Sequence, residues 1–171
     1  MNSTNDKIIT IFGGSKCTED SHEYQEAMAL GSKLADAGYT ICTGGYLGIM
    51  EAASRGAREK GGRVLGIVMN QFKSEPNRFL TDKVATDHFY DRLQNLILRS
   101  SGFVAFRGGM GTVTEVSLVW KQVADAHPRV AAASPDRGLL AARGQGLADF
   151  ARRERRRCRD PKFCGRRRAG V

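Results

Sequence analysis

Three short apolar segments of this chain each end in a glycine turn. Residues 7–12, 39–42 and 102–106 are rich in β-branched and aromatic side chains and are too short for core helices, which is typical of buried strands. The turns that follow them contain Gly13-Gly14, Gly44-Gly45 and Gly108-Gly109. Because glycine has no Cβ, each turn lets the backbone approach a ligand closely. The pattern predicts a ligand site where several strands end.

Helical segments separate the strands. Ala27, Leu30 and Leu34 recur at helical spacing, Asp20 or Ser21 can cap that helix, and Gly38 ends it. The remaining predicted elements are helices to about residue 60, over 90–101 and over 112–123, strands over 63–68 and 84–86, and a polar loop over 70–82. This alternation predicts a Rossmann-like α/β fold: an open parallel sheet with helices on both faces and a ligand site at the carboxyl ends of its strands.

The charge of the chain is unevenly distributed. Residues 1–127 contain 14 basic and 14 acidic residues, whereas residues 128–171 contain 13 basic residues, twelve of them arginine, and four acidic ones. The net charge of +9 therefore comes from the second segment. We expect residues 1–127 to form the Rossmann-like domain and residues 128–171 to form a basic, Arg-rich C-terminal segment that is partly disordered or atypical.

Three explanations of this C-terminal segment stay open. It is a disordered basic tail, an extension that binds nucleic acid, or an altered terminus such as a frame-shifted gene end. The abrupt change from lysine to arginine motivates the third explanation. We expect the C-terminal part of the fold to be incomplete or disordered. We do not expect nucleic acid to be the main partner of the chain.

The C-terminal segment has one candidate helix. Leu139 and Leu140 can share a helix face with Leu147 and Phe150.

Membrane and metal chemistry find no support in the sequence. No apolar run approaches the ~20 residues of a membrane span, and the N-terminus does not resemble a signal peptide, so we expect a cytoplasmic protein without membrane contact. The cysteines at positions 17, 42, 158 and 164 and the histidines at positions 22, 88 and 127 lack the spacing of a metal site. We therefore expect free thiols and no metal.

The segment from Arg107 to Glu115 has the most specific pattern, Arg-Gly-Gly-Met-Gly-Thr-Val-Thr-Glu. It resembles the signature Pro-Gly-Gly-x-Gly-Thr-x-x-Glu of the LONELY GUY (LOG) family of nucleotide phosphoribohydrolases, long labelled "lysine decarboxylase-like". Arg92 stands fifteen residues before the motif, where the family has an arginine. Two earlier family patterns are matched by Gly14-Ser15 and by residues 44–50. The chain departs from the family pattern at Arg107 in place of Pro, Leu93 in place of Lys and Thr43 in place of Gly.

This resemblance implies hydrolysis of the N-glycosidic bond of a nucleoside 5′-monophosphate, such as a cytokinin riboside 5′-monophosphate or AMP, to free base and ribose 5-phosphate. It implies a homodimer, no cofactor, and catalysis by Arg92 and Glu115. The substrate-binding residues would be Gly14, Ser15, Gly44, Gly45, Gly48, Gly108, Gly109, Gly111 and Thr112.

The chemistry of these residues fits that role. The 5′-phosphate would lie against the N–H groups of residues 109–112 and the Thr112 hydroxyl. Glu115 would stabilise an oxocarbenium-like ribose or orient the attacking water. Arg92 would either bind phosphate or hold Glu115 ionised and in place.

Two alternatives remain beside this interpretation. Thr112-x-x-Glu115 also fits a capping box, which needs no substrate. The same fold can also bind a nucleotide or a cofactor as a non-catalytic carrier, because fold does not determine function.

Overall fold

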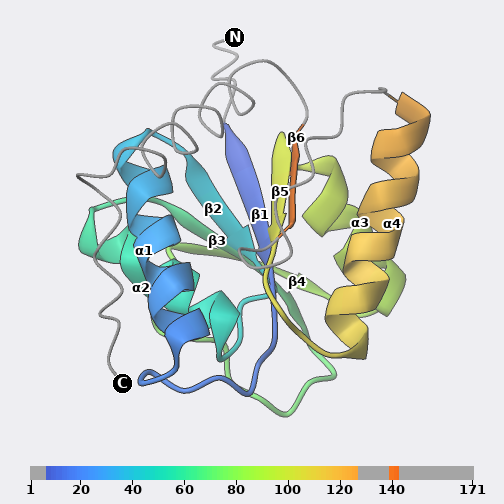
Figure 1. Cartoon of the computed structure of the whole chain (residues 1–171). Helices are drawn as coiled ribbons and strands as arrows, with labels where there is room; N and C mark the ends of the chain where they lie inside the picture. Colours follow the sequence, from blue (N-terminus) through green and yellow to red (C-terminus); the bar gives the residue numbers. More distant parts are fainter. Residues whose placement is uncertain (1–6, 127–138, 143–171) are drawn as a thin grey trace, which may run out of the picture.

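The computed structural model describes residues 7–126 and 139–142, and the side chains of residues 7–122. Strands and helices alternate along these residues, as predicted (Figure 1). Their bounds are β1 (Ile8–Phe12), α1 (His22–Asp36), β2 (Thr40–Thr43), α2 (Ile49–Glu59), β3 (Val64–Met69), β4 (Asp82–Thr86), α3 (Phe89–Leu98), β5 (Gly102–Ala105), α4 (Met110–Ala126) and β6 (Leu139–Ala142).

The strands form one sheet in the order β4-β3-β2-β1-β5-β6. The five strands β1 to β5 are parallel, which confirms the predicted open parallel sheet. The chain crosses from β4 at one edge to β5 beside β1, so the direction of winding reverses between β1 and β5. In open α/β sheets the ligand crevice lies at such a switch point, outside the carboxyl ends of the strands.

The sixth strand differs from the prediction for its residues. Leu139 and Leu140 do not lie on a helix but pair antiparallel with Ala105 and Val104. The physical reason is that β5 would otherwise present unpaired backbone groups at the sheet edge, and β6 provides partners for them. Leu147, Phe150 and most of the Arg-rich C-terminal segment lie outside the described residues, and so do the predictions for them.

Helices cover both faces of the sheet, as predicted. Figure 1 shows α1 and α2 on one face and α3 and α4 on the other. Side chains alternate along β1 accordingly: Ile9 and Ile11 join the core under α1 and α2, whereas Phe12 joins the core under α3 and α4. The predicted cap of α1 is confirmed at Ser21, whose hydroxyl oxygen accepts a hydrogen bond from the Tyr24 N–H.

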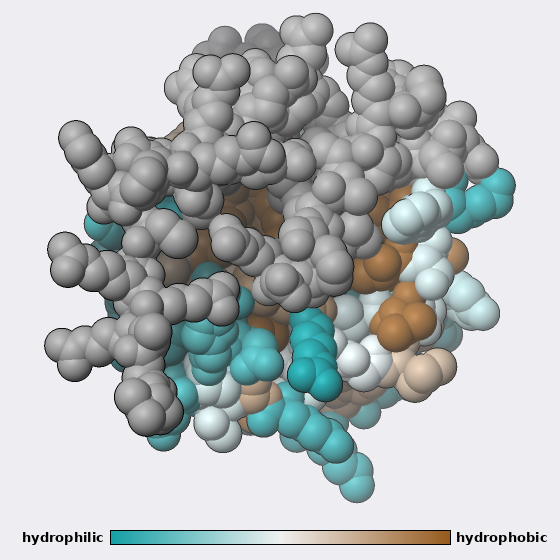
Figure 2. Space-filling view, in the orientation of Figure 1, coloured by the Kyte–Doolittle hydropathy of each residue, from teal (hydrophilic) through white to brown (hydrophobic). Residues whose placement is uncertain are grey.

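Helix α4 leaves hydrophobic side chains exposed. Met110, Val113 and Trp120 are 79 %, 53 % and 55 % exposed and recur at helical spacing along one face. Figure 2 shows hydrophobic surface over the part of the molecule where α4 lies. Within residues 7–126, none of the helices has the length and apolar character needed to cross a membrane.

Candidate functional site

The three glycine turns meet at the carboxyl edge of the sheet. The Gly14 N–H donates to the carbonyl oxygen of Arg107 at 3.0 Å, and the Gly14 carbonyl oxygen accepts from the Ile49 N–H at 3.0 Å. Gly48 has a φ of +69°, and a Cβ there would also collide with Gly14 and Ser15. The first turn therefore contacts both others, so the predicted substrate-binding residues of all three turns are neighbours.

The third turn leads into the N-terminus of α4. Within the helix, the Val113 N–H donates to the Gly109 carbonyl oxygen at 3.1 Å, so the N–H groups of residues 110–112 have no partner inside the helix. A Cβ on Gly109 or Gly111 would meet no described atom within 4 Å, and neither glycine has a positive φ. Packing and backbone conformation do not require glycine at these two positions, whereas the close approach of an anionic ligand would account for both.

The capping-box alternative for Thr112 and Glu115 is wrong. Helix α4 begins at Met110, two residues before the predicted start, so Thr112 is its third residue and is not the N-cap. Glu115 lies in the second turn, where its carboxylate pairs with Arg92 and not with the backbone of the helix end. Thr112 is 8 % exposed, and its hydroxyl lies against Gly108 without a hydrogen bond to another described residue.

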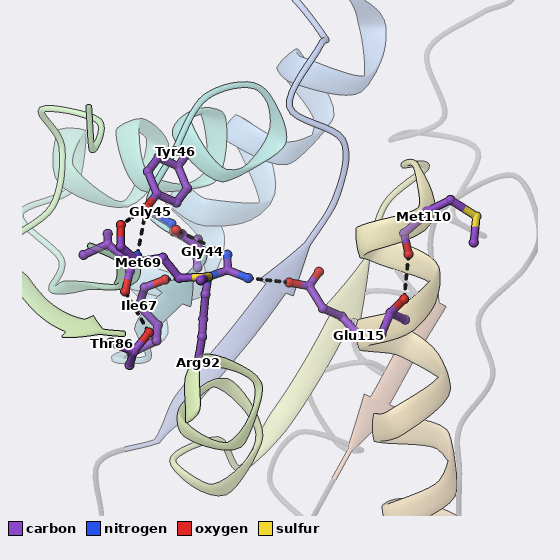
Figure 3. Close-up of polar contacts among 12 residues, drawn as sticks. Gly44, Gly45, Tyr46, Ile67, Met69, Thr86, Arg92, Met110 and Glu115 are labelled. Carbon is purple, nitrogen blue, oxygen red and sulfur yellow. Dashed lines mark hydrogen bonds and ion pairs between the residues drawn. The ribbon is translucent and has the colours of Figure 1, made fainter. Parts of the chain in front are cut away.

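Arg92 and Glu115 form a buried ion pair beside these turns (Figure 3). Arg92 extends from α3 and Glu115 from α4, and Arg92 Nη1 lies 3.2 Å from Glu115 Oε1. Arg92 Nε also donates to the Ile67 carbonyl oxygen at 3.0 Å, and Nη2 donates to the Gly44 carbonyl oxygen at 3.4 Å. All three guanidinium nitrogens are therefore engaged within the protein. Of the two roles considered for Arg92, this geometry favours holding Glu115 over binding phosphate directly.

The surroundings of Glu115 alter its acidity. Burial raises the pKa of the Glu115 carboxyl above its ordinary value, and the charge and hydrogen bond of Arg92 oppose that shift. Water screens the charge of a buried carboxylate only weakly, so the carboxylate interacts strongly with a positive charge that develops nearby. Gly44 makes the arrangement possible, since a Cβ there would collide with the Arg92 guanidinium.

The second glycine turn is held by Thr43 and Asn77, neither of which is among the predicted site residues. The Gly45 N–H donates to Thr43 Oγ1 at 3.1 Å. Asn77 donates its backbone N–H to the Gly45 carbonyl oxygen at 2.8 Å and its side-chain Nδ2 to the Tyr46 carbonyl oxygen at 2.9 Å. Asn77 lies in the predicted polar loop, and an asparagine in a loop carries no sequence signal that identifies a partner 31 residues away.

Besides Thr43, the other two departures from the family motif can also be located relative to the site. Arg107 contributes its backbone carbonyl oxygen to the first turn, and its side chain is exposed. Proline offers the same carbonyl, so the replacement preserves this contact. Leu93 is buried in α3 next to Arg92 and brings no charge to the site.

The cysteines and other potential metal ligands lie apart. Within residues 7–122, no group of three or more His, Cys, Asp or Glu side chains is arranged to hold a metal ion. Cys17 and Cys42 are free, and burial raises the pKa of the Cys42 thiol to about 11. Cys158 and Cys164 lie outside the described residues.

Comparison with known proteins supports the motif assignment. The sequence profile of the SLOG cluster4 family matches residues 6–125. An uncharacterised protein of Archaeoglobus fulgidus is 32 % identical over 114 residues, which cover 67 % of this chain and 74 % of that protein. A cytokinin riboside 5′-monophosphate phosphoribohydrolase of Mycobacterium marinum is 30 % identical over 99 residues, 56 % of this chain and 53 % of the relative.

A solved structure has the same fold. The molybdenum cofactor binding protein of Rippkaea orientalis superposes with a TM-score of 0.64 at 30 % identity, covering 70 % of this chain and 74 % of that protein. This chain thus spans about half the length of the M. marinum relative and about three quarters of the R. orientalis protein.

Proposed function

The chain belongs to the SLOG cluster4 family of LOG-type proteins, and we propose that it hydrolyses the N-glycosidic bond of a nucleoside 5′-monophosphate. The products are the free base and ribose 5-phosphate. The observation that carries this proposal is the buried Arg92–Glu115 pair, which lies beside three converging glycine turns and the N-terminus of α4. A phosphate site and a desolvated carboxylate are the two elements that this reaction needs.

The phosphate site anchors the substrate. The N–H groups of residues 110–112 and the positive end of α4 favour an anion. The Thr112 hydroxyl, which has no hydrogen bond to another described residue, can donate to a phosphate oxygen. Gly109 and Gly111 leave room for that anion next to the backbone. Binding the remote phosphate fixes the position of the ribose, so part of the barrier is overcome by orientation.

Glu115 acts on the ribose. When the C1′–N bond breaks, its electron pair leaves with the base and positive charge develops on the ribose. The Glu115 carboxylate stabilises this charge and orients the water whose oxygen forms the new bond to C1′. The attacking water loses one proton and the departing base nitrogen gains one, so the products are neutral base and ribose 5-phosphate. Arg92 keeps Glu115 ionised and in one position.

We further propose that the chain acts as a homodimer. The exposed face of α4 supports this, because Met110 begins it at the candidate phosphate site and Val113 and Trp120 continue it along the helix. A second copy that covers this face would exclude water near the site. Light scattering would measure a dimer mass for the full chain, and Trp120→Glu would shift it to the monomer.

A carrier function is the second candidate. It is favoured by the more complete match to the R. orientalis molybdenum cofactor binding protein, of which this chain covers 74 %. In that case the glycine turns would bind a nucleotide or a phosphate-bearing cofactor without cleaving it.

One experiment separates the two candidates. The full chain is incubated with AMP and with an N6-substituted derivative of AMP, and chromatography measures free base while calorimetry measures binding. Base release that depends on the chain supports the hydrolase. Tight binding of a nucleotide without base release supports the carrier and contradicts the hydrolase.

A further inference from the structure

Arg55 connects two loops that are attached to the candidate site. It lies on α2, its Nη1 donates to Glu19 Oε2 at 2.8 Å, and its guanidinium carbon lies 6.0 Å from the centre of the Phe79 ring. Its Nε donates to Glu59 Oε1 at 3.1 Å within the same helix. The contacts with Glu19 and Phe79 reach two separate loops, whereas the contact with Glu59 stays inside α2.

Both of these loops are attached to the glycine turns. Glu19 belongs to residues 13–21, which run from the first glycine turn to α1, and the first turn is bonded to the other two. Phe79 belongs to residues 70–81, and its N–H donates to Asn77 Oδ1 at 3.1 Å. Asn77 in turn donates to the backbone of the second glycine turn.

These contacts form a closed series that links both loops, α2 and the glycine turns. Each loop is held at one point by a glycine turn and at a second point by Arg55. Helix α2, which carries Arg55, itself begins directly after the second turn, with Ile49 bonded to Gly14. Surface loops with few buried contacts open readily, so a second attachment limits the conformations that they adopt before ligand arrives.

We propose that Arg55 is a positioning residue that holds both loops against the glycine turns and thereby raises ligand affinity without contributing to the chemical step. This inference rests on the proposed function, because it takes the glycine turns as the ligand site. The guanidinium suits the task, since its planar group donates to a carboxylate and lies over an aromatic ring at the same time, which a lysine ammonium does less well.

The test compares Arg55→Gln with two matched controls. Glu59→Gln removes only the contact inside α2, and Arg63→Gln removes another surface ion pair, with Asp82, at the amino end of β3. Hydrogen exchange of the ligand-free full chain reports on residues 13–21 and 70–81, and base release from AMP gives kcat and KM.

We expect Arg55→Gln to accelerate exchange in both loops and to raise KM about fivefold, the effect of one surface ion pair on an equilibrium. The expected kcat stays within about twofold, because the Arg92–Glu115 pair is untouched. Arg55→Lys is expected to recover part of the loss, Glu19→Gln to loosen only residues 13–21, and both controls to behave like the wild type.

Unchanged exchange in Arg55→Gln overturns the proposal, as does faster exchange with an unchanged KM. A fall in kcat at constant KM also overturns it, since Arg55 would then act on the chemical step. If the wild-type chain releases no base, the proposed hydrolysis fails on its own; faster loop exchange together with weaker nucleotide binding by calorimetry still upholds the role of Arg55.

Discussion

Replacing Glu115 by glutamine is expected to abolish base release and leave the fold intact. Glutamine has almost the same volume, and its side-chain oxygen can still accept the hydrogen bond that Arg92 Nη1 donates at 3.2 Å. Arg92 also keeps its bonds to the carbonyl oxygens of Ile67 and Gly44, so the guanidinium stays hydrogen-bonded. The substitution therefore removes one charge and little else.

The size of the effect follows from where that charge lies. Glu115 is 9 % exposed, so water screens its interaction with the ribose cation only weakly. Removing one preorganised electrostatic group from such a site typically lowers kcat by about 10²–10³, or ~3–4 kcal/mol of transition-state stabilisation. We expect Glu115→Gln to lower kcat by this factor with a KM close to that of the wild type, because the phosphate contacts remain.

The assay measures free base released from AMP over a range of concentrations, with thermal unfolding of each variant as the check on the fold. Glu26→Gln on α1, where Glu26 pairs with the exposed His22, provides a matched loss of one carboxylate away from the site. An unchanged kcat in a folded Glu115→Gln variant would refute the assigned role of Glu115. A comparable loss in the Glu26 control would show that the effect is not specific to the site.

Three further predictions concern the same edge of the sheet. Arg92→Met should raise the pKa of the Glu115 carboxyl further, because burial then acts without the opposing charge of Arg92. Since the proposed mechanism needs the ionised carboxylate, the acidic limb of the profile of kcat against pH should move to higher pH, and an unchanged limb contradicts the pairing. Gly48→Ala should lower the free energy of unfolding by about 2 kcal/mol or more, measured in urea, because φ is +69° and the methyl group would meet Gly14; a neutral result contradicts the close contact of the turns. Thr112→Val should raise KM for AMP about tenfold by removing a hydrogen bond to a charged group, and equal KM values would place the phosphate elsewhere.

Local patterns accounted for much of the secondary structure. Short β-branched runs that end at glycine identified β1, β2 and β5, and Ser21 identified the start of α1. The predicted start of α4 is two residues too late because Gly109, which precedes the helix, has no side chain that could form a capping hydrogen bond. Because of this shift, Thr112 and Glu115 do not form a capping pair. Thr112 lies in the first turn of α4, and Glu115 belongs to the buried ion pair with Arg92.

The alternation of strands and helices, the three glycine turns and the motif around Glu115 can all be predicted from the amino-acid sequence, because each depends on residues adjacent in the chain. How Arg92 and Glu115 interact depends on the packed fold, since Arg92 lies on α3 and the three groups bonded to its guanidinium come from β3, the second turn and α4. Asn77 and Arg55 likewise act through partners more than twenty residues away. Charge and burial at such positions arise from packing between elements, which short-range patterns do not encode.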